Sequence, residues 1–317
     1  MSELEQAVAT VIERCLRVRA GETVLVVADP VSTDIGEALL AAARVAGADP
    51  VLAILPPDAS RGTEPPAPVA AALAAADVFV APCLPSLSHT SARKRACEAG
   101  HRGATMPGVT ADMLARLMST DFDALAQRCR AVARLLDAAA EARITCAHGT
   151  DLRLDLRGRP GISDEGDLSA PGAFGNLPCG EGFTSPAGGE GTIATSDLAG
   201  VGMTAEPVVL SVRDGRVAGA AGAGDAAGRF LALLDAHGPL GRNLAELGVG
   251  TNDRATVTGN ILEDEKILGT VHVAFGASAG IGGTVTVPVH LDVVVFEPSL
   301  WIGETQVLDG GRWLLDA

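Results

Sequence analysis

The sequence contains no tyrosine, and aromatic residues make up only 3% of its 317 positions. Cysteine is also scarce: the six cysteines show no C-x-x-C spacing, which argues against a zinc knuckle or a disulfide framework and predicts reduced, mostly buried thiols. Basic residues are few, because 24 lysines and arginines stand against 39 acidic residues and leave a net charge of −15. Since phosphate contacts need clustered lysine and arginine, we expect no nucleic acid and no anionic membrane as a partner.

Long apolar runs are missing as well. No stretch approaches the ~18 consecutive apolar residues that cross a bilayer, and the opening segment, MSELEQAVATVIERCLRV, is charged and amphipathic rather than signal-like. We therefore expect a globular protein that stays in the cytoplasm. Hydrophobic residues nevertheless make up 47% of the chain, which is enough for a substantial core in each of two domains.

The first part of the chain alternates between helical and strand periodicity. The pattern predicts helices near 3–18, 33–46 and 66–76, and strands at 23–28, 50–55 and 77–81. A short strand near 103–106, a helix opening at Thr110 and a long helix from about 121 to 142 continue it. Such alternation implies a parallel sheet covered by helices. We assign residues 1–141 to an N-terminal α/β domain.

Short strand-like segments and glycine-rich turns dominate the rest of the sequence. One helix is predicted near 226–236, and a closing hairpin is predicted at Asp309-Gly310-Gly311. The glycine-rich segment 222–228 does not have the G-x-G-x-x-G spacing of a dinucleotide-binding loop. This pattern of short strands and turns predicts a mixed, largely antiparallel domain over residues 142–317. The fold class predicted for the whole chain is therefore α/β plus α+β.

Scattered acidic and histidine residues in the C-terminal domain point to a metal site. His290 and Asp292 are separated by one residue in an alternating apolar run, so on a strand both side chains project from one face. Burying an unpaired carboxylate and imidazole is costly, and a cation removes that cost. A buried hydrogen bond between the two without metal is the alternative. Two further candidate ligands in the same domain, Glu181 and His272, favour a metal site over this alternative.

Two further residues are candidates for catalysis. His89 lies in SLSHTSARKR, which we expect at the carboxyl end of a strand, where open α/β sheets bind ligands; a helix-capping role is the alternative. Glu265 lies just ahead of His272 and is a candidate general base or partner of a ligand, the alternative being a solvated helix end. Cys179 has no histidine close in sequence to activate it, and we assign it to packing.

Eight ordered segments of the sequence are similar to one known family. They are RAGETVLVVAD, SLSHTSARKRACEAG, MPGVTADML, GTDLRLDLRGR, NLPCGEGFTSP, NLAELGVGTN, EDEKILGTVHVAFG and VHLDVVV. Through them the chain resembles the aminopeptidase T family of metallopeptidases over nearly its full length, in particular the short members labelled leucyl aminopeptidase. The fold of this superfamily also resembles that of 2,5-dihydroxypyridine 5,6-dioxygenase, a ring-opening enzyme that uses one ferrous ion.

The resemblance implies which residues would hold metal. The family's peptidases bind two divalent ions through two glutamates, two histidines, an aspartate and a tyrosine. By motif position, the first five correspond here to Glu181, Glu246, His272, His290 and Asp292. Glu181 would bridge or bind the ions and take part in catalysis. The family's tyrosine follows the first histidine by a few residues, and its absence from this chain puts the second metal position in question.

Three functions are compatible with these observations. The main expectation is a hydrolase of the aminopeptidase type, acting on a small peptide or amide with one or two Zn²⁺, Co²⁺ or Mn²⁺ ions per chain. The second is a mononuclear Fe(II) ring-opening dioxygenase for a dihydroxypyridine-like aromatic, with His272, His290 and Asp292 as its facial triad and His89 orienting the substrate. The third is a catalytically inactive relative that binds a small molecule. The resemblance also implies a homodimer.

Overall fold

The computed structural model describes residues 1–56 and 64–315 and divides into two compact units. Neither unit is a simple half of the chain. Unit 1 comprises Met1–Thr120 and Gly166–Cys179, and unit 2 comprises Asp121–Glu165 and Gly180–Ala317.

Unit 1 is built on a five-stranded parallel sheet with the order β2-β1-β3-β4-β8. Its strands are β1 (Thr23–Ala28), β2 (Asp49–Ile54), β3 (Val78–Ala81), β4 (Arg102–Thr105) and β8 (Phe174–Asn176). The apolar runs TVLVVA and VFVA form β1 and β3, which are almost completely buried. Such continuous runs are typical of parallel strands that are covered on both faces.

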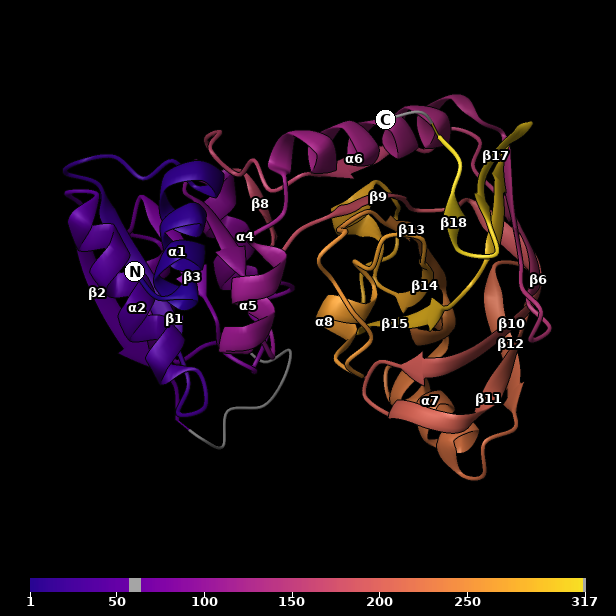
Figure 1. Ribbon diagram of the computed structural model, residues 1–317. Coiled ribbons are helices and arrows are strands. Elements are labelled where there is room, and N and C mark those ends of the chain that lie inside the picture. Colours follow the sequence, from indigo (N-terminus) through magenta and orange to yellow (C-terminus); the bar gives the residue numbers. More distant parts are fainter. Residues whose placement is uncertain (57–63, 316–317) are drawn as a thin grey trace. The chain divides into compact units, whose positions relative to one another are not determined.

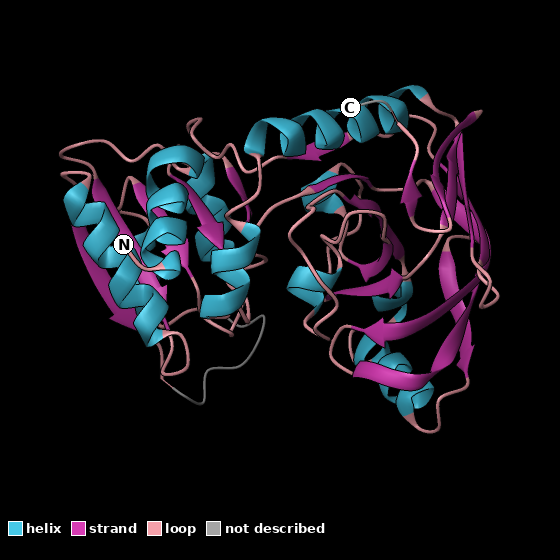
Figure 2. Ribbon diagram, viewed as in Figure 1, coloured by secondary structure: helices cyan, strands magenta, loops and turns pink. Residues whose placement is uncertain are grey.

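Helices lie around this sheet (Figure 2). They are α1 (Glu3–Ala9), continued by a π-helical segment (Thr10–Cys15), α2 (Thr33–Val45), α3 (Ala67–Leu73), α4 (Ser91–Glu98) and α5 (Ala111–Leu117). Ser2 and Glu5 form a reciprocal capping box at α1, and the hydroxyls of Thr90 and Thr110 accept from the first turns of α4 and α5. Helix α1 packs against α2 and α5, and α3 packs against α4.

Unit 2 is built on one long, largely antiparallel sheet with the order β18-β17-β16-β5-β6-β10-β15-β14-β13-β9-β7, to which β11 and β12 are added beside β10. Its strands are β5 (Glu141–Thr145), β6 (Asp151–Asp155), β7 (Ile162–Asp164), β9 (Glu181–Thr184), β10 (Gly188–Leu198), β11 (Gly202–Arg213), β12 (Arg216–Ala221), β13 (Leu244–Gly250), β14 (Val271–Gly276), β15 (His290–Val295), β16 (Ser299–Ile302), β17 (Thr305–Asp309) and β18 (Arg312–Trp313).

Two helices cover parts of this sheet (Figure 1). Helix α6 (Phe122–Ala138) packs against β7 and β9, and α7 (Ala226–Asp235) packs against β11 and β12. Phe230 of α7 meets Phe275 of β14 edge to face, with the ring centroids 6.3 Å apart. Short helices complete the unit: Pro239–Arg242, α8 (Ile261–Asp264) and Ala279–Ile281. Strands β13 and β14 are buried along their whole length, so the centre of the sheet is also the centre of the core.

The predicted fold class is confirmed: a parallel α/β unit is joined to a mixed unit with much antiparallel sheet. The division of the chain differs from the expected boundary at 141/142. Helix α6 belongs to unit 2 rather than closing unit 1, because its apolar face packs on β9, and the 166–179 segment returns to unit 1 to supply β8. No helix among the described residues is both long and apolar enough to span a membrane.

Arg102 anchors the end of the parallel sheet and offers a test of the fold of unit 1. Its guanidinium donates to both carboxylate oxygens of Glu22 and to the carbonyls of Leu16 and Arg17. We expect Arg102→Met to lower the free energy of unfolding by roughly 2–3 kcal/mol in urea denaturation followed by circular dichroism, since it removes the charged partner of the largely buried Glu22 carboxylate and leaves it the backbone N–H of Arg19 as a donor. These hydrogen bonds from Arg102 hold the pKa of Glu22 below its ordinary value, so the difference should shrink as the pH falls and Glu22 takes up a proton.

The matched control is Arg17→Met in the same unit. Arg17 pairs with Asp167 at 3.1 Å, but the two side chains are 61% and 44% exposed. Exposed pairs of this kind contribute less than about 1 kcal/mol. Equal losses in the two variants would show that the buried contacts of Arg102 carry no special weight.

Candidate metal centre

Four neighbouring strands of unit 2, in the order β15-β14-β13-β9, carry the acidic and histidine side chains that the sequence singles out. The strand register places them on one face. Asp292 of β15 and Glu246 of β13 both lie opposite Ala274 of β14, on its two sides. Directly opposed residues of antiparallel strands project to the same face, so the two carboxylates flank a small methyl side chain.

His272 of β14 reaches the same face because it lies two residues before Ala274. Its partner across the ladder is Gly248, and Glu181 of β9 lies opposite Gly250. Both glycines are required for space: a Cβ atom at Gly248 would lie 2.0 Å from His272 Nε2, and one at Gly250 would lie 2.1 Å from the carbonyl oxygen of Ile267. The room for the site is thus made by residues without side chains.

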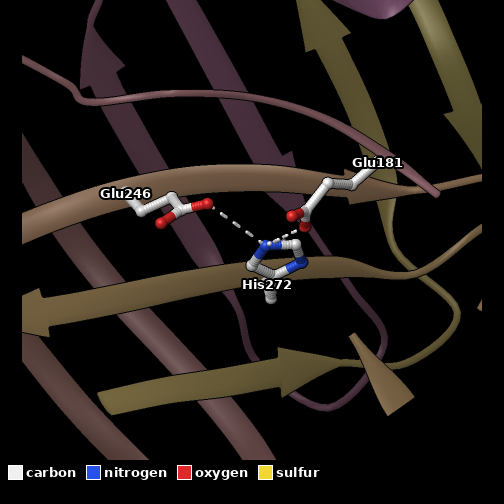
Figure 3. Close-up of side chains that lie close together, drawn as sticks. All are labelled: Glu181, Glu246 and His272. Atoms are coloured by element: carbon white, nitrogen blue, oxygen red, sulfur yellow. Dashed lines mark ion pairs between the residues drawn. The ribbon is translucent and has the colours of Figure 1, made fainter. Parts of the chain in front are cut away.

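Glu181, Glu246 and His272 form the first of three ligand groups, which we call the inner group. All three side chains are almost fully buried, with exposed fractions of 7%, 6% and 1%. His272 Nε2 lies between the carboxylates, 3.0 Å from Glu181 Oε2 and 3.6 Å from Glu246 Oε1 (Figure 3). The potential ligand atoms lie within 4.8 Å of one another, close enough to converge on one ion.

Glu246, His290 and Asp292 form the second group, the outer group, which shares Glu246 with the first. His290 Nε2 lies 3.1 Å from Glu246 Oε2 and 3.6 Å from Asp292 Oδ1. The other ring nitrogen, Nδ1, lies 2.8 Å from the carbonyl oxygen of Ala277 and donates to it, since a carbonyl only accepts. A histidine held in this way directs Nε2 toward a metal ion, which is the usual arrangement of metal-bound imidazoles.

Two neighbouring residues of the chain, Glu265 and Lys266, close the site from the segment after α8. Lys266 Nζ lies 2.6 Å from Glu181 Oε1 and 2.9 Å from Glu265 Oε1, and its side chain is 1% exposed. Glu265 forms the third ligand group with His272 and Asp292, and their potential ligand atoms lie within 4.8 Å of one another. The expected alternative of a solvated helix end for Glu265 is therefore wrong, because the side chain is buried among charged groups.

Charge in the site shifts the pKa values of its members. Burial acts to raise the pKa of Glu181, but attraction by Lys266 and His272 lowers it to about 2. Burial likewise acts on Glu246, and its contacts with His272 and His290 lower the pKa to about 2. Burial opposes a charge on the two imidazoles, yet the facing carboxylates hold the pKa of both well above the ordinary value. A divalent ion binding here must displace protons from the histidines.

Glu265 behaves in the opposite way. Burial raises its pKa, the charges of Asp292 and Glu181 add to the rise, and attraction by Lys266 offsets it only in part, which leaves a pKa of about 8. Its carboxyl group therefore carries a proton near neutral pH. That proton lies beside two potential ligands, His272 and Asp292.

The donor set fits a divalent transition-metal ion. Imidazole nitrogens and carboxylate oxygens are ligands that Fe²⁺, Zn²⁺, Mn²⁺ and Co²⁺ all accept. Glu181 Oε2, although it faces His272, has no hydrogen-bond partner among the described residues, so a buried anionic oxygen is available for a cation. The chain thus holds groups of side chains able to bind a metal ion, which agrees with the coarse expectation of a divalent metal cofactor.

The structure brings together all five residues that the sequence proposed as ligands, and Glu265 with them. His89 lies in unit 1, in the exposed turn after β3 and directly before the N-cap of α4. Cys179 is 1% exposed. Lys266 is the residue that sequence reasoning missed. A lysine in the charged run EDEK usually indicates a solvated surface, and the only signal against this was its distance of six residues from His272.

Together the fold and the cluster define a two-unit protein with a carboxylate–histidine cluster, able to bind a metal ion, on an antiparallel sheet. Residues 3–314 match the family model NicX, 2,5-dihydroxypyridine 5,6-dioxygenase, and the chain belongs to this family. A solved structure of 2,5-dihydroxypyridine dioxygenase from Pseudomonas putida KT2440 is 21% identical, with a TM-score of 0.84 over 100% of this chain and 99% of that chain. Wild-type AmpT from Thermus thermophilus is 19% identical, with a TM-score of 0.69 over 99% of each chain. No curated protein matches this chain.

These findings correct the main functional expectation. The hydrolase of the aminopeptidase type is wrong, because the family match over nearly the whole chain is to a dioxygenase. The similarity to AmpT reflects a shared fold, which explains why motif positions pointed to that family. The peptide or amide substrate has no support, whereas a small aromatic substrate agrees with the family. The homodimer stays a prediction.

Gly248 provides a direct test of the geometry of the centre. We expect Gly248→Ala to displace the imidazole of His272, since the new Cβ would overlap Nε2, and to lower the free energy of unfolding by about 1–3 kcal/mol, because the buried pairs of His272 with Glu181 and Glu246 are disturbed. Metal content by elemental analysis and the melting temperature should be measured together. Gly219→Ala is the control, because Gly219 lies in strand β12 and a Cβ atom there would have no atom within 4 Å. A Gly248 variant that melts at the same temperature as the control would show that the imidazole of His272 does not fill the space beside Gly248.

Proposed function

We propose that the protein is a metal-dependent ring-opening dioxygenase that acts on a dihydroxypyridine-like aromatic and uses one Fe(II) ion. The observation that carries the proposal is the outer group. It combines a histidine whose Nδ1 is held by the carbonyl of Ala277 with two carboxylates, in a chain whose family is described as 2,5-dihydroxypyridine 5,6-dioxygenase. When bound, a ferrous ion supplies the redox chemistry by which O₂ reacts with a hydroxylated ring.

The ligands of the ion are part of this proposal. The expected triad contains His272, His290 and Asp292, but the two histidines fall in different ligand groups. His290 and Asp292 are common to the triad and the outer group, and their side chains are 13% and 16% exposed. A catalytic ion needs open positions that substrate can reach. We therefore place it in the outer group, with Glu246 as third ligand and His272 adjacent to Glu246.

The side chains around the ion have separate tasks. Ala277 fixes the ring of His290 through its carbonyl, so that Nε2 keeps its direction. Glu265 holds a proton on its carboxyl group beside Asp292 and is placed to exchange it with a hydroxyl group of the substrate. The buried inner group and the strand face of small residues exclude water from the rear of the site.

The first test is the reaction itself. Anaerobically purified protein reconstituted with Fe(II) should consume one O₂ per 2,5-dihydroxypyridine and abolish the absorbance of the aromatic ring. Zn²⁺ should occupy the site without supporting turnover, because it has no redox chemistry. Ring loss that proceeds equally without O₂, or with Zn²⁺, would contradict the dioxygenase.

Ligand variants are the controls for this test. His290→Ala and Asp292→Ala should lose both iron and turnover. Glu246→Ala should resemble them if the ion sits in the outer group, whereas His272→Ala should keep the iron. The reverse order for Glu246 and His272 would show that the two-histidine triad holds the ion instead.

His89 is proposed to orient the substrate. Its turn follows the carboxyl end of β3, which is the edge of a parallel sheet where ligands bind. We expect His89→Gln to raise KM or lower kcat about 10-fold or more while iron content stays unchanged. His101→Gln is the matched control, since His101 lies at the opposite end of the same sheet, directly before β4. Equal activity of the two variants would exclude a role for His89.

A further inference from the structure

Lysine occurs only twice in this chain, among 24 basic residues, and one of the two is buried beside the metal ligands. Lys266 is 1% exposed, and Glu181 and Glu265 both lie within 3.0 Å of its ammonium group. A buried lysine is rare unless it is paired. Nothing in the proposed reaction uses this residue, although it touches a member of the inner group.

The backbone holds Lys266 in place from two sides. Its N–H donates to the carbonyl of Glu263 at 2.9 Å, and its carbonyl accepts from the N–H of Asn252 at 2.8 Å. The next residue, Ile267, forms a bridge with Asn252. The side chain therefore starts from a fixed point and is directed to Glu181, rather than reaching it by chance from a mobile loop.

The ammonium group competes with a metal ion for the inner group. Lys266 occupies Oε1 of Glu181, so an ion bound by the same carboxylate would have only Oε2 and would lie next to a fixed positive charge. Repulsion between two cations a few ångströms apart is strong where water is excluded. The outer group has no such fixed cation among the described residues. Its carboxylates, Glu246 and Asp292, pair with histidines, which can lose their protons when a metal ion binds.

We propose that Lys266 is the resident cation of the inner group and thereby limits the centre to a single metal ion, held by the outer group. This inference rests on the proposed function in one respect only, namely that the outer group binds the catalytic ion. Lysine is suited to this role. The ammonium of lysine is a compact point charge that can take the place of an ion, whereas the planar guanidinium of arginine cannot.

The experiment counts metal ions in the full-length protein without substrate or oxygen. Wild type, Lys266→Met and Lys266→Gln are dialysed against Mn²⁺ and analysed for bound metal and by electron paramagnetic resonance. We expect one equivalent and a mononuclear spectrum for wild type. Both variants should bind two equivalents, the second at least 10-fold more tightly than any second ion in wild type, with the spectrum of a coupled pair. Lys94→Met is the control, since Lys94 lies on helix α4 of unit 1, and it should bind one equivalent.

Each possible ion count either supports or overturns the role proposed for Lys266. Two tightly bound ions in wild type would overturn the proposal without any variant, and so would folded Lys266 variants that still bind one. If both variants fail to fold, the wild-type count remains the test, and one equivalent supports the proposal. Because neither measurement involves turnover, failure of the dioxygenase reaction would leave the ion count standing, and an active dioxygenase with two ions would overturn only the role of Lys266.

Discussion

The burial of negative charge on one face of the antiparallel sheet is the constraint that governs this structure. Glu181 and Glu246 are each less than 10% exposed, and Asp292 is largely buried beside them. Unpaired carboxylates at such a depth are costly. Lysine and two protonated histidines compensate part of this charge, and a divalent ion compensates it better because it accepts several oxygens at once. The buried carboxylates therefore favour a bound cation, and the pKa shifts in the site arise from the same buried charges.

The same constraint explains the sequence of the surrounding strands. A charged cluster needs space inside a core, and β13 and β14 provide it through Gly248, Gly250 and Ala274, which lie on the face of the ligands. The opposite faces of these strands carry Val249, Val273 and similar residues that pack into the main core. Small and apolar residues thus alternate along each strand. The small residues make room for the site on one face, and the apolar residues stabilise the core on the other.

Much of this arrangement was predictable from sequence because it is encoded locally. The spacing of His290 and Asp292 indicated a shared strand face, and the alternation before residue 120 indicated a parallel sheet. Three features were not local. Strand β8 joins unit 1 from a point far along the chain from β4, α6 packs with unit 2, and Lys266 is buried only because strands distant in sequence close around it. Pairings of this kind depend on tertiary contacts that periodicity does not report.

The identity of the ligands alone could not decide between a hydrolase and a dioxygenase. Glutamate, histidine and aspartate suit hydrolytic and redox metals equally well, and two proteins with different names share this fold. What separates the reactions is the number of ions and the charge around them. Glu246, which the inner and outer groups share, is the carboxylate placed to bridge two ions, whereas Glu181, a ligand of the inner group, is already engaged by an ammonium group. Lys266, which stands in the charged run EDEK of the sequence, is thus the residue most informative about chemistry.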